Sequence, residues 1–198
     1  MKSDRPKYKQ IIEAAVEVIA ENGFHASQVS KIAKKANVAD GTIYLYFKNK
    51  EDILISVFKE KMGSFVSITR GAIQEQSSAS EKLQTFIHMH YYQLASNPDL
   101  AIVTQLELRQ SKTELRIEIN NILKDYLQII DDILEQGIQD GEIRDDINLQ
   151  TMRQMIFGTL DETVTTWVMK LQKYSLTNET NEIHQLLTKG LFIADKKG

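Results

Sequence analysis

Residues 43 to 47 place five large side chains in a row, and two lysines follow at once. A helix of two turns cannot bury all of these groups on one face, so some must face solvent. Ile43 and Phe47 are four positions apart and share a face, which predicts that both pack inward. The side chains left on the outer side are Thr42, Tyr44, Leu45, Tyr46, Lys48 and Lys50.

The chemistry that such a surface can perform is recognition of double-stranded DNA. Thr42, at the start of the expected helix, is placed to contact a base edge or a phosphate. Tyr44 and Leu45 can contact base edges and thymine methyl groups, and the Tyr46 hydroxyl can donate to a phosphate oxygen. Lys50, at the start of the next helix, favours a phosphate through its charge and the helix dipole. The alternative is that these aromatic side chains pack under a neighbouring domain.

A second short helix is expected just before this one. Ser27 is predicted to cap it, and Ser27 and Gln28 can donate to phosphates, while Ser30 projects towards a groove edge. Gly41 removes a side chain where the backbone must come close to DNA. Two helices joined by a tight turn within residues 27–47 have the spacing of a helix-turn-helix motif.

The charge is distributed unevenly along the chain. Residues 1–50 contain nine Lys/Arg and five Asp/Glu, whereas residues 51–198 contain fifteen and twenty-two. A basic end on an acidic body suggests that only the basic end binds a polyanion.

The absence of cysteine excludes disulfides and thiol–zinc sites. The chain start lacks the apolar core of a signal peptide, and no apolar run approaches the roughly 20 residues that span a bilayer. We therefore expect a cytoplasmic protein that does not enter the membrane.

Almost every segment of the chain has helical periodicity, which predicts an all-α fold of about nine helices. We expect a three-helix DNA-binding domain at residues 1–50 and a helical effector-binding and dimerisation domain at residues 51–198. Asn22-Gly23 is expected to end the first helix, and Asn97-Pro98 to open a later one. Further helix starts are predicted at Ser80, at Asn148, and at Thr177 or Asn178.

Two expected helices near the carboxyl end carry apolar side chains at spacings of three and four. Stripes of this kind predict that two helices from each protomer form a four-helix bundle in a homodimer. Glycine within the last stripe would permit close helix approach. The alternative is that the stripes pack inside one protomer. The predicted dimer residues are Leu149, Met152, Ile156, Leu160, Val164, Trp167, Leu187, Gly190 and Leu191.

Apolar side chains elsewhere in the body are candidates for a small-molecule pocket. They are Phe86, Met89, Ile102, Leu106 and Met155. Arg109 is expected two helical turns beyond Ile102, with Gln105 nearby. Because a buried arginine needs an anionic partner, Arg109 can bind a carboxylate or phosphate of a ligand. The alternative partner for Arg109 is an internal carboxylate, Asp161 or Glu162.

Residues 11–54 resemble the DNA-binding domain of the TetR family of bacterial repressors. The matching motifs are Asn22-Gly23-Phe24, Ile32-Ala33, Gly41-Thr42-Ile43-Tyr44, Tyr46-Phe47 and Lys50-Glu51. Ser27-Gln28 stands where two threonines are usual, and Asn37 stands where glycine is usual. Asparagine also tolerates left-handed backbone, so we expect the turn to survive. The resemblance implies a helical body that binds an inducer and dimerises through its last two helices on a palindromic operator.

Residues 99–111 and 153–169 resemble, within that family, the repressors of fatty-acid degradation in Gram-positive bacteria. This narrower resemblance implies that long-chain acyl-CoA is the effector and that fatty-acid degradation genes are controlled. No cofactor and no metal are expected. The alternative effector is another lipophilic ligand such as a cationic drug, for which Asp161, Glu162 and Trp167 would supply acidic and aromatic lining.

Two other classes of protein fit the sequence less well. An enzyme is disfavoured because the chain has no nucleotide-binding or hydrolase fingerprint. His88 and His90 diverge by about 200° on a helix and cannot chelate one metal together, so we expect one buried and one exposed histidine. A purely architectural DNA protein would not need so long an acidic body.

Overall fold

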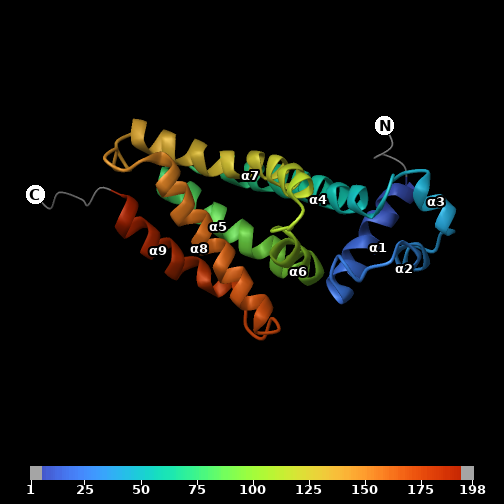
Figure 1. Cartoon of the computed structure of the whole chain (residues 1–198). Helices are drawn as coiled ribbons and strands as arrows, with labels where there is room; N and C mark the ends of the chain where they lie inside the picture. The colour runs from blue at the N-terminus through green and yellow to red at the C-terminus, as the bar shows by residue number, and fades with distance from the viewer. Residues whose placement is uncertain (1–5, 193–198) are drawn as a thin grey trace, which may run out of the picture. The chain divides into compact units, whose positions relative to one another are not determined.

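The computed structural model describes residues 6–192 and consists of helices joined by short connections (Figure 1). Between residues 6 and 192 the β-type pairing is confined to one isolated bridge, between Ile143 and Phe192. The predicted all-α fold of about nine helices is therefore confirmed. The helices are α1 (Pro6–Asn22), α2 (Val29–Lys35), α3 (Asp40–Tyr44), α4 (Lys50–Gln74), α5 (Ala79–Ala95), α6 (Pro98–Glu107), α7 (Thr113–Gln139), α8 (Leu149–Met169), the 3-10 helix η2 (Leu176–Glu179) and α9 (Thr180–Leu191).

The chain forms two compact units. Within the described residues, unit 1 comprises residues 6–63 and 97–122, and unit 2 comprises residues 64–96 and 123–192. The compact units therefore do not follow the sequence-based division at residue 50, because α6 and the first part of α7 return to unit 1. Across residues 6–192, no helix is both long and apolar enough to cross a membrane.

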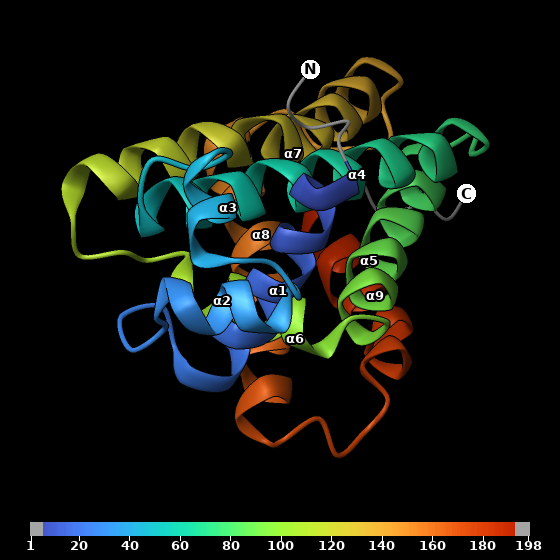
Figure 2. The same ribbon diagram turned by 90° about the vertical axis from the view of Figure 1, so that its right-hand side faces the viewer.

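Unit 1 is built around α1, which packs against both α2 and α6 (Figure 2). The apolar positions of α1 recur at helical spacing, so one face of α1 enters the core. Ile32 of α2 and Ile43 of α3 are fully buried, and Phe47 is also buried. The Tyr8 ring stacks on Phe47 with centroids 5.2 Å apart. The prediction that Ile43 and Phe47 both point inward is confirmed.

Two turns of unit 1 have left-handed backbone. Gly23 follows the end of α1 with φ at 73°, and Asn37 follows α2 with φ at 49°. The expected end of the first helix at Asn22-Gly23 is thus confirmed. The expectation that asparagine would support the turn at position 37 is confirmed as well, because Asn is one of the few non-glycine residues that visit this region at low cost.

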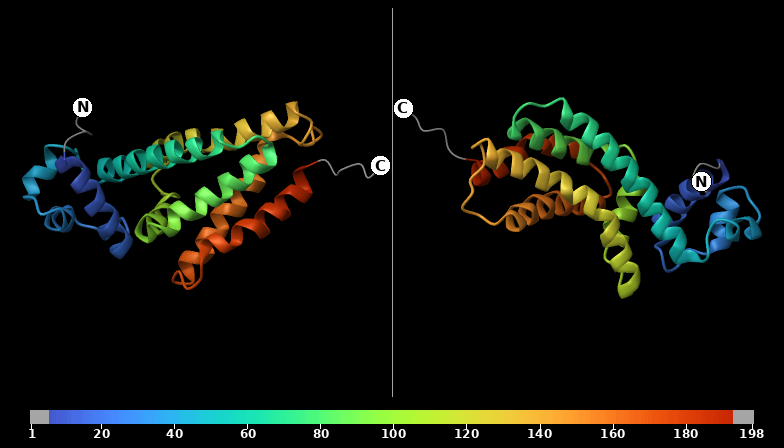
Figure 3. Two further views of the ribbon diagram at one scale, coloured as in Figure 1. Left: turned by 180° about the vertical axis from the view of Figure 1, so that it is seen from behind. Right: turned by 90° about the horizontal axis from the view of Figure 1, so that it is seen from above.

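Unit 2 contains α5, α8 and α9 side by side, together with the last parts of α4 and α7 (Figures 1 and 3). Large aromatic side chains, including Phe86, Tyr91 and Tyr126, fill its core without exposure above 1%. The side chains of Ile143 and Ala79 pack directly against Gly137 of α7. A Cβ atom at Gly137 would lie 2.6 Å from Ile143 Cδ1 and 2.8 Å from Ala79 Cβ.

Several predicted helix boundaries were right and others were wrong. Asn97 and Asn148 cap α6 and α8 as expected. The cap of α5 is Ser78, two residues before the predicted Ser80, because Ser78 and Glu81 form a reciprocal capping box. The last helix was expected to start after Thr177 or Asn178. Those residues belong to the 3-10 helix η2, and α9 starts at Thr180.

Candidate DNA-reading and regulatory sites

The predicted DNA-reading surface lies on α2, α3 and the residues that follow α3. Two large apolar side chains are unusually exposed there, Tyr44 at 59% and Leu45 at 71%. Thr42 is half-buried, and a Cβ atom at Gly41 would meet nothing within 4 Å. The other exposed members of the set are Gln28, Ser30 and Lys48. Helices α2 and α3 pack on each other within unit 1, so these side chains belong to two adjacent helices and the residues after α3.

Tyr46 has a mixed environment. It lies just beyond α3, and its half-buried ring is 6.3 Å from the rings of both Tyr8 and Phe47. Ring packing within unit 1 holds Tyr46 in place, and its contact with a phosphate stays a prediction. Tyr44, by contrast, is not packed under another segment of unit 1, because most of its surface is exposed.

The predicted role of Ser27 is wrong. Its side chain is only 2% exposed, and its hydroxyl donates to the Gly23 carbonyl at 2.7 Å and to the Val18 carbonyl at 3.1 Å. The hydroxyl is therefore directed into unit 1 and away from any phosphate. Ser27 is not the cap of α2 either, because Gln28 occupies that position without a side-chain capping bond.

Lys50 also differs from its predicted role. Its ammonium group donates to the carbonyl oxygens of Phe24, at 2.9 Å, and His25, at 2.8 Å, and lies 4.7 Å from the Phe24 ring centroid. These bonds and the cation–π contact hold the ammonium group against the turn that follows α1. Lys50 therefore stabilises that turn, and its ammonium group is not directed towards DNA.

The same turn is bound from its other side by Glu107, a residue that the sequence analysis missed. Glu107 is the last residue of α6 and is 9% exposed. Its Oε1 accepts from the Phe24 amide at 2.8 Å, and its Oε2 accepts from Gln110 Nε2 at 2.6 Å. Glu107 is a single acidic residue between two leucines, and this pattern does not predict a contact with a residue 83 positions away.

The predicted ligand residues are divided between the two units. Ile102, Gln105, Leu106 and Arg109 belong to unit 1, whereas Phe86, Met89 and Met155 belong to unit 2. Gln105 and Phe86 are buried, Ile102 and Met89 are half-buried, and Leu106 and Met155 are exposed.

The premise used for Arg109 was wrong. Because α6 ends at Glu107, Arg109 lies beyond the helix and is exposed. Arg109 is therefore neither on the helical stripe of Ile102 nor buried as predicted.

The predicted dimer stripe lies mostly inside unit 2. The exposure of Met152, Ile156, Leu160, Val164, Trp167, Leu187 and Leu191 does not exceed 4% within one protomer. Leu149 is half-buried and Gly190 is exposed. The stripe therefore packs within the protomer, the alternative left open by the sequence, because the same spacing serves an internal core equally well.

Unit 2 contains a buried polar pair in its aromatic core. The Tyr126 hydroxyl lies 2.7 Å from His90 Nδ1. Burial lowers the pKa of His90 to about 3, so the ring is neutral at physiological pH.

His88 is exposed and stacks on Tyr92, which confirms the prediction of one buried and one exposed histidine. Among the residues with described positions, no cluster of three His, Cys, Asp or Glu side chains could hold a metal.

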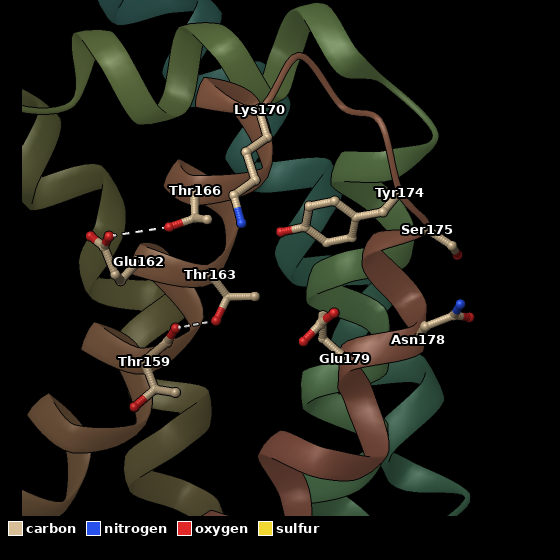
Figure 4. A pocket seen from close by; sticks show the side chains of 9 residues that line it. All are labelled: Thr159, Glu162, Thr163, Thr166, Lys170, Tyr174, Ser175, Asn178 and Glu179. Carbon is tan, nitrogen blue, oxygen red and sulfur yellow. Dashed lines mark hydrogen bonds between the residues drawn. The ribbon is translucent and has the colours of Figure 1, made fainter.

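A groove of about 740 Å³ runs along α8 and the segment that leads through η2 (Figure 4). Thr166 Oγ1 donates to Glu162 at 3.3 Å, and Thr163 Oγ1 donates to the Thr159 carbonyl at 2.7 Å. The side chains that line the groove carry hydroxyl, amide, ammonium and carboxylate groups. The lining residues are Thr159, Glu162, Thr163, Thr166, Lys170, Tyr174, Ser175, Asn178 and Glu179.

Comparisons with known proteins agree with this architecture. Residues 11–57 match the model of "Bacterial regulatory proteins, tetR family", and residues 58–190 match "YsiA-like protein, C-terminal region". The chain is 63% identical to the "Fatty acid metabolism regulator protein" of Bacillus subtilis, over 96% of this chain and 98% of that protein. It is similar to the crystal structure of Bacillus subtilis FadR in complex with stearoyl-CoA, with a TM-score of 0.90 over 92% of this chain and 98% of that one. It is also similar to FadR of Bacillus halodurans, with 58% identity and a TM-score of 0.92 over 94% of this chain and 96% of that one.

Proposed function

This chain belongs to the TetR family of bacterial transcription regulators, and from that membership we propose that it represses fatty-acid degradation genes and leaves its operator when long-chain acyl-CoA binds. The observation that carries the proposal is the 63% identity, over nearly the whole chain, to a regulator of fatty acid metabolism whose structure was determined with stearoyl-CoA. The relatives described above are transcription regulators, and the chain's own exposed DNA-reading surface fits that role.

The reading surface of the proposed repressor is carried by α2, α3 and the residues after α3. Tyr44 and Leu45 are the side chains best exposed for base edges and thymine methyl groups. The groups proposed to contact phosphates are the hydroxyls of Thr42, Ser30 and Tyr46, with Gln28 and Lys48. Phosphate contacts would fix the position of the protein on DNA, and base contacts would select the sequence.

We propose a homodimer that reads a palindromic operator through two such surfaces about 34 Å apart. The proposed interface is the exposed side of α8 and α9. Met155 is 41% exposed and Leu186 is 66% exposed, and a Cβ atom at Gly190 would lie 3.9 Å from Met155 Cε. Two apolar side chains beside the exposed Gly158 and Gly190 form a surface that a second copy can cover. Met155, expected from the sequence to contact the ligand, is therefore proposed to lie in the dimer interface instead.

The effector is proposed to be a long-chain acyl-CoA, and its acyl tail requires an apolar site. Phe86 and Met89 of unit 2, and Ile102, Gln105, Leu106 and Arg109 of unit 1, remain the candidate ligand residues. The runner-up is another lipophilic ligand. Asp161 and Trp167 were expected to line the site of such a ligand. Both are buried, which argues against this alternative.

The experiment that tests the proposal is an operator titration at one fixed salt concentration, because affinity for DNA depends steeply on salt. The operator would be a palindrome selected from random DNA. Stearoyl-CoA would be added in one arm, and stearic acid and coenzyme A would be added separately in two others. Release by stearoyl-CoA alone is the expected result. Operator binding that no acyl-CoA disturbs would refute the effector and leave the TetR-type regulator in place.

A further inference from the structure

Tyr8, in the first turn of α1, lies where three segments of unit 1 meet. Its ring stacks on Phe47 with centroids 5.2 Å apart, and lies 6.3 Å from the ring of Tyr46. Its hydroxyl donates to Glu60 Oε1 of α4 at 3.3 Å. Burial raises the pKa of Tyr8 above its ordinary value of 10, so the hydroxyl keeps the proton that it donates. One buried side chain of α1 therefore contacts both α4 and the two residues that end the helix-turn-helix.

A second contact joins α1 to α4 close to the first. Lys61 of α4 forms an ion pair with Glu13 of α1 at 2.5 Å, and the Lys61 side chain is only 16% exposed. In the sequence, Glu13 lies five positions after Tyr8, and Lys61 directly follows Glu60. Two neighbouring contacts fix the position of α1 along α4 better than either contact alone. The Tyr8 ring thus has a defined position, set by α1 and α4, against which the residues after α3 can pack.

The residues after α3 depend on such support, because α3 itself is short. It comprises only Asp40–Tyr44, and so short a helix is not stable by its own backbone bonds in water. Phe47 is buried, whereas Tyr46 is only half-buried and has fewer contacts that fix its rotamer. Contact with the rings of Tyr8 and Phe47 restricts that rotamer. Tyr46 therefore loses less side-chain entropy when its hydroxyl binds a phosphate.

We propose that Tyr8 is a positioning residue for operator binding, and that its ring and its bond to Glu60 hold Tyr46 in the orientation that contacts a DNA phosphate. This inference rests on the proposed function, because it assigns a residue that supports the proposed reading surface. Tyr8 is buried, so it acts through Tyr46 and not by touching DNA. The effector has no part in this role, which is exerted in the free protein and in the DNA complex alike.

The test is a double-mutant cycle in the full-length protein, with Tyr8→Leu, Tyr46→Phe and the double variant. Tyr8→Phe is added because it keeps the stacked ring and removes only the bond to Glu60. The control is Phe58→Leu, since Phe58 of α4 is also buried in unit 1. In the described part of the chain, the ring contacts of Tyr46 are with Tyr8 and Phe47 and not with Phe58. Operator dissociation constants would be measured without effector, at one salt concentration, well below the unfolding temperature of every variant.

We expect Tyr8→Leu to weaken operator binding about tenfold, and Tyr8→Phe to weaken it about two- to threefold. The change Tyr46→Phe should cost about fivefold in the wild type but less than about twofold in Tyr8→Leu. The reason is that a hydroxyl no longer held in place contributes little affinity that can be lost. Phe58→Leu should lower the unfolding temperature, and should leave both the operator affinity and the effect of Tyr46→Phe unchanged.

Equal effects of Tyr46→Phe with and without Tyr8 would overturn the inference, because independent residues contribute additively. A loss of stability in Tyr8→Leu at unchanged operator affinity would overturn it too, since the ring would then serve only the core of unit 1. An equal loss of affinity in Phe58→Leu would have the same meaning. If Tyr8→Leu does not fold, the same cycle with Tyr8→Phe decides.

Failure of the proposed function gives a different result. If stearoyl-CoA does not release the wild type from its operator, the proposed effector is wrong, and the cycle still decides the role of Tyr8 because it contains no effector. A wild type that selects no DNA would reject the repressor and the role of Tyr8 together.

Discussion

At the scale of single residues, burial decides which polar side chains are available to a partner. The sequence predicts phosphate contacts for Ser27 and Lys50, but both side chains bind backbone carbonyl oxygens of unit 1, whereas Lys48 is exposed. The difference depends on contacts with Val18, Gly23, Phe24 and His25, which no local pattern reveals. Tyr44 and Leu45 were predictable because a very short helix cannot bury them.

Replacing Tyr46 by phenylalanine tests the proposed phosphate contact. Tyr46→Phe keeps the half-buried ring and removes the hydroxyl, so we expect operator binding to weaken by about 1 kcal/mol, or roughly fivefold. Because a phosphate contact carries no sequence information, binding to unrelated DNA should weaken equally. Tyr92→Phe, at an exposed tyrosine of unit 2, is the control in the same titration. A loss confined to one base pair of the operator would contradict the phosphate role.

The neutral state of His90 predicts how the stability of the protein depends on pH. The pKa of His90 is about 3 in the folded protein and close to its ordinary value of 6.5 in the unfolded chain. Below pH 6.5 the unfolded chain therefore binds a proton that the folded protein does not. Stability should be lost as the pH falls from about 6.5 towards 3, by about 1.4 kcal/mol per pH unit from this residue.

The measurement is urea unfolding at pH 7, 6 and 5. His90→Gln keeps a polar group beside the Tyr126 hydroxyl but cannot titrate, so its stability should fall less steeply with acid. The exposed His88 provides the control, and His88→Gln should keep the wild-type slope. Equal slopes for His90→Gln and the wild type would show that His90 does not titrate as proposed.

At the scale of helices and turns, sequence reasoning succeeded where one residue type is required and failed where several solutions are equivalent. Gly23 and Asn37 were predictable because left-handed backbone admits few residue types. Asn97-Pro98 was predictable because both residues favour the first positions of a helix. The apolar stripe of α8 predicted a buried face correctly but not what covers it. An internal core and a protein interface select the same side chains at the same spacing.

Gly137 gives a prediction for α7 that a helix-propensity scale would get wrong. Alanine normally stabilises a helix interior by about 1 kcal/mol relative to glycine. At Gly137 the added methyl group would lie 2.8 Å from the Ala79 side chain and closer still to Ile143. We therefore expect Gly137→Ala to destabilise the protein by about 1–3 kcal/mol, the usual cost of overpacking. Thermal unfolding of purified variants would measure the change.

Gly63 of α4 is the matched control for this substitution. It is exposed, and a Cβ atom there would meet nothing within 4 Å. Gly63→Ala should therefore be neutral or stabilising by up to about 1 kcal/mol. Equal effects at the two glycines would mean that the approach of α7 to the start of α5 does not restrict position 137.

At the scale of the whole molecule, the order of the chain and the compact units do not coincide. The sequence divides naturally after the helix-turn-helix, yet residues 97–122 return to unit 1 and include the Glu107 contact. Local patterns cannot reveal such a return, because it depends on which helices pack together after distant segments meet. The identity of the proposed effector came from resemblance rather than from any residue pattern. An apolar body with nearby cationic side chains fits many amphipathic anions.

The surface of the proposed homodimer can be tested directly. Met155→Glu and Leu186→Glu each place a charge on the exposed side of α8 or α9. We expect both variants to remain folded and to sediment as monomers at concentrations where the wild type is dimeric. Burial of an unpaired carboxylate opposes association, whereas an exposed carboxylate in the monomer costs little. Operator affinity should fall sharply, because a palindrome would then be read one half-site at a time.

Two controls separate the interface from the core of unit 2. Tyr92→Glu changes another exposed position, at 53% exposure on α5, and should leave the dimer intact. Leu160→Glu changes the fully buried stripe of α8 and should unfold the protein rather than yield a folded monomer. If Met155→Glu and Leu186→Glu both sediment as dimers while Leu160→Glu unfolds, the exposed side of α8 and α9 is not the interface. The partner must then cover another surface, since the stripe predicted from the sequence is already buried within one protomer.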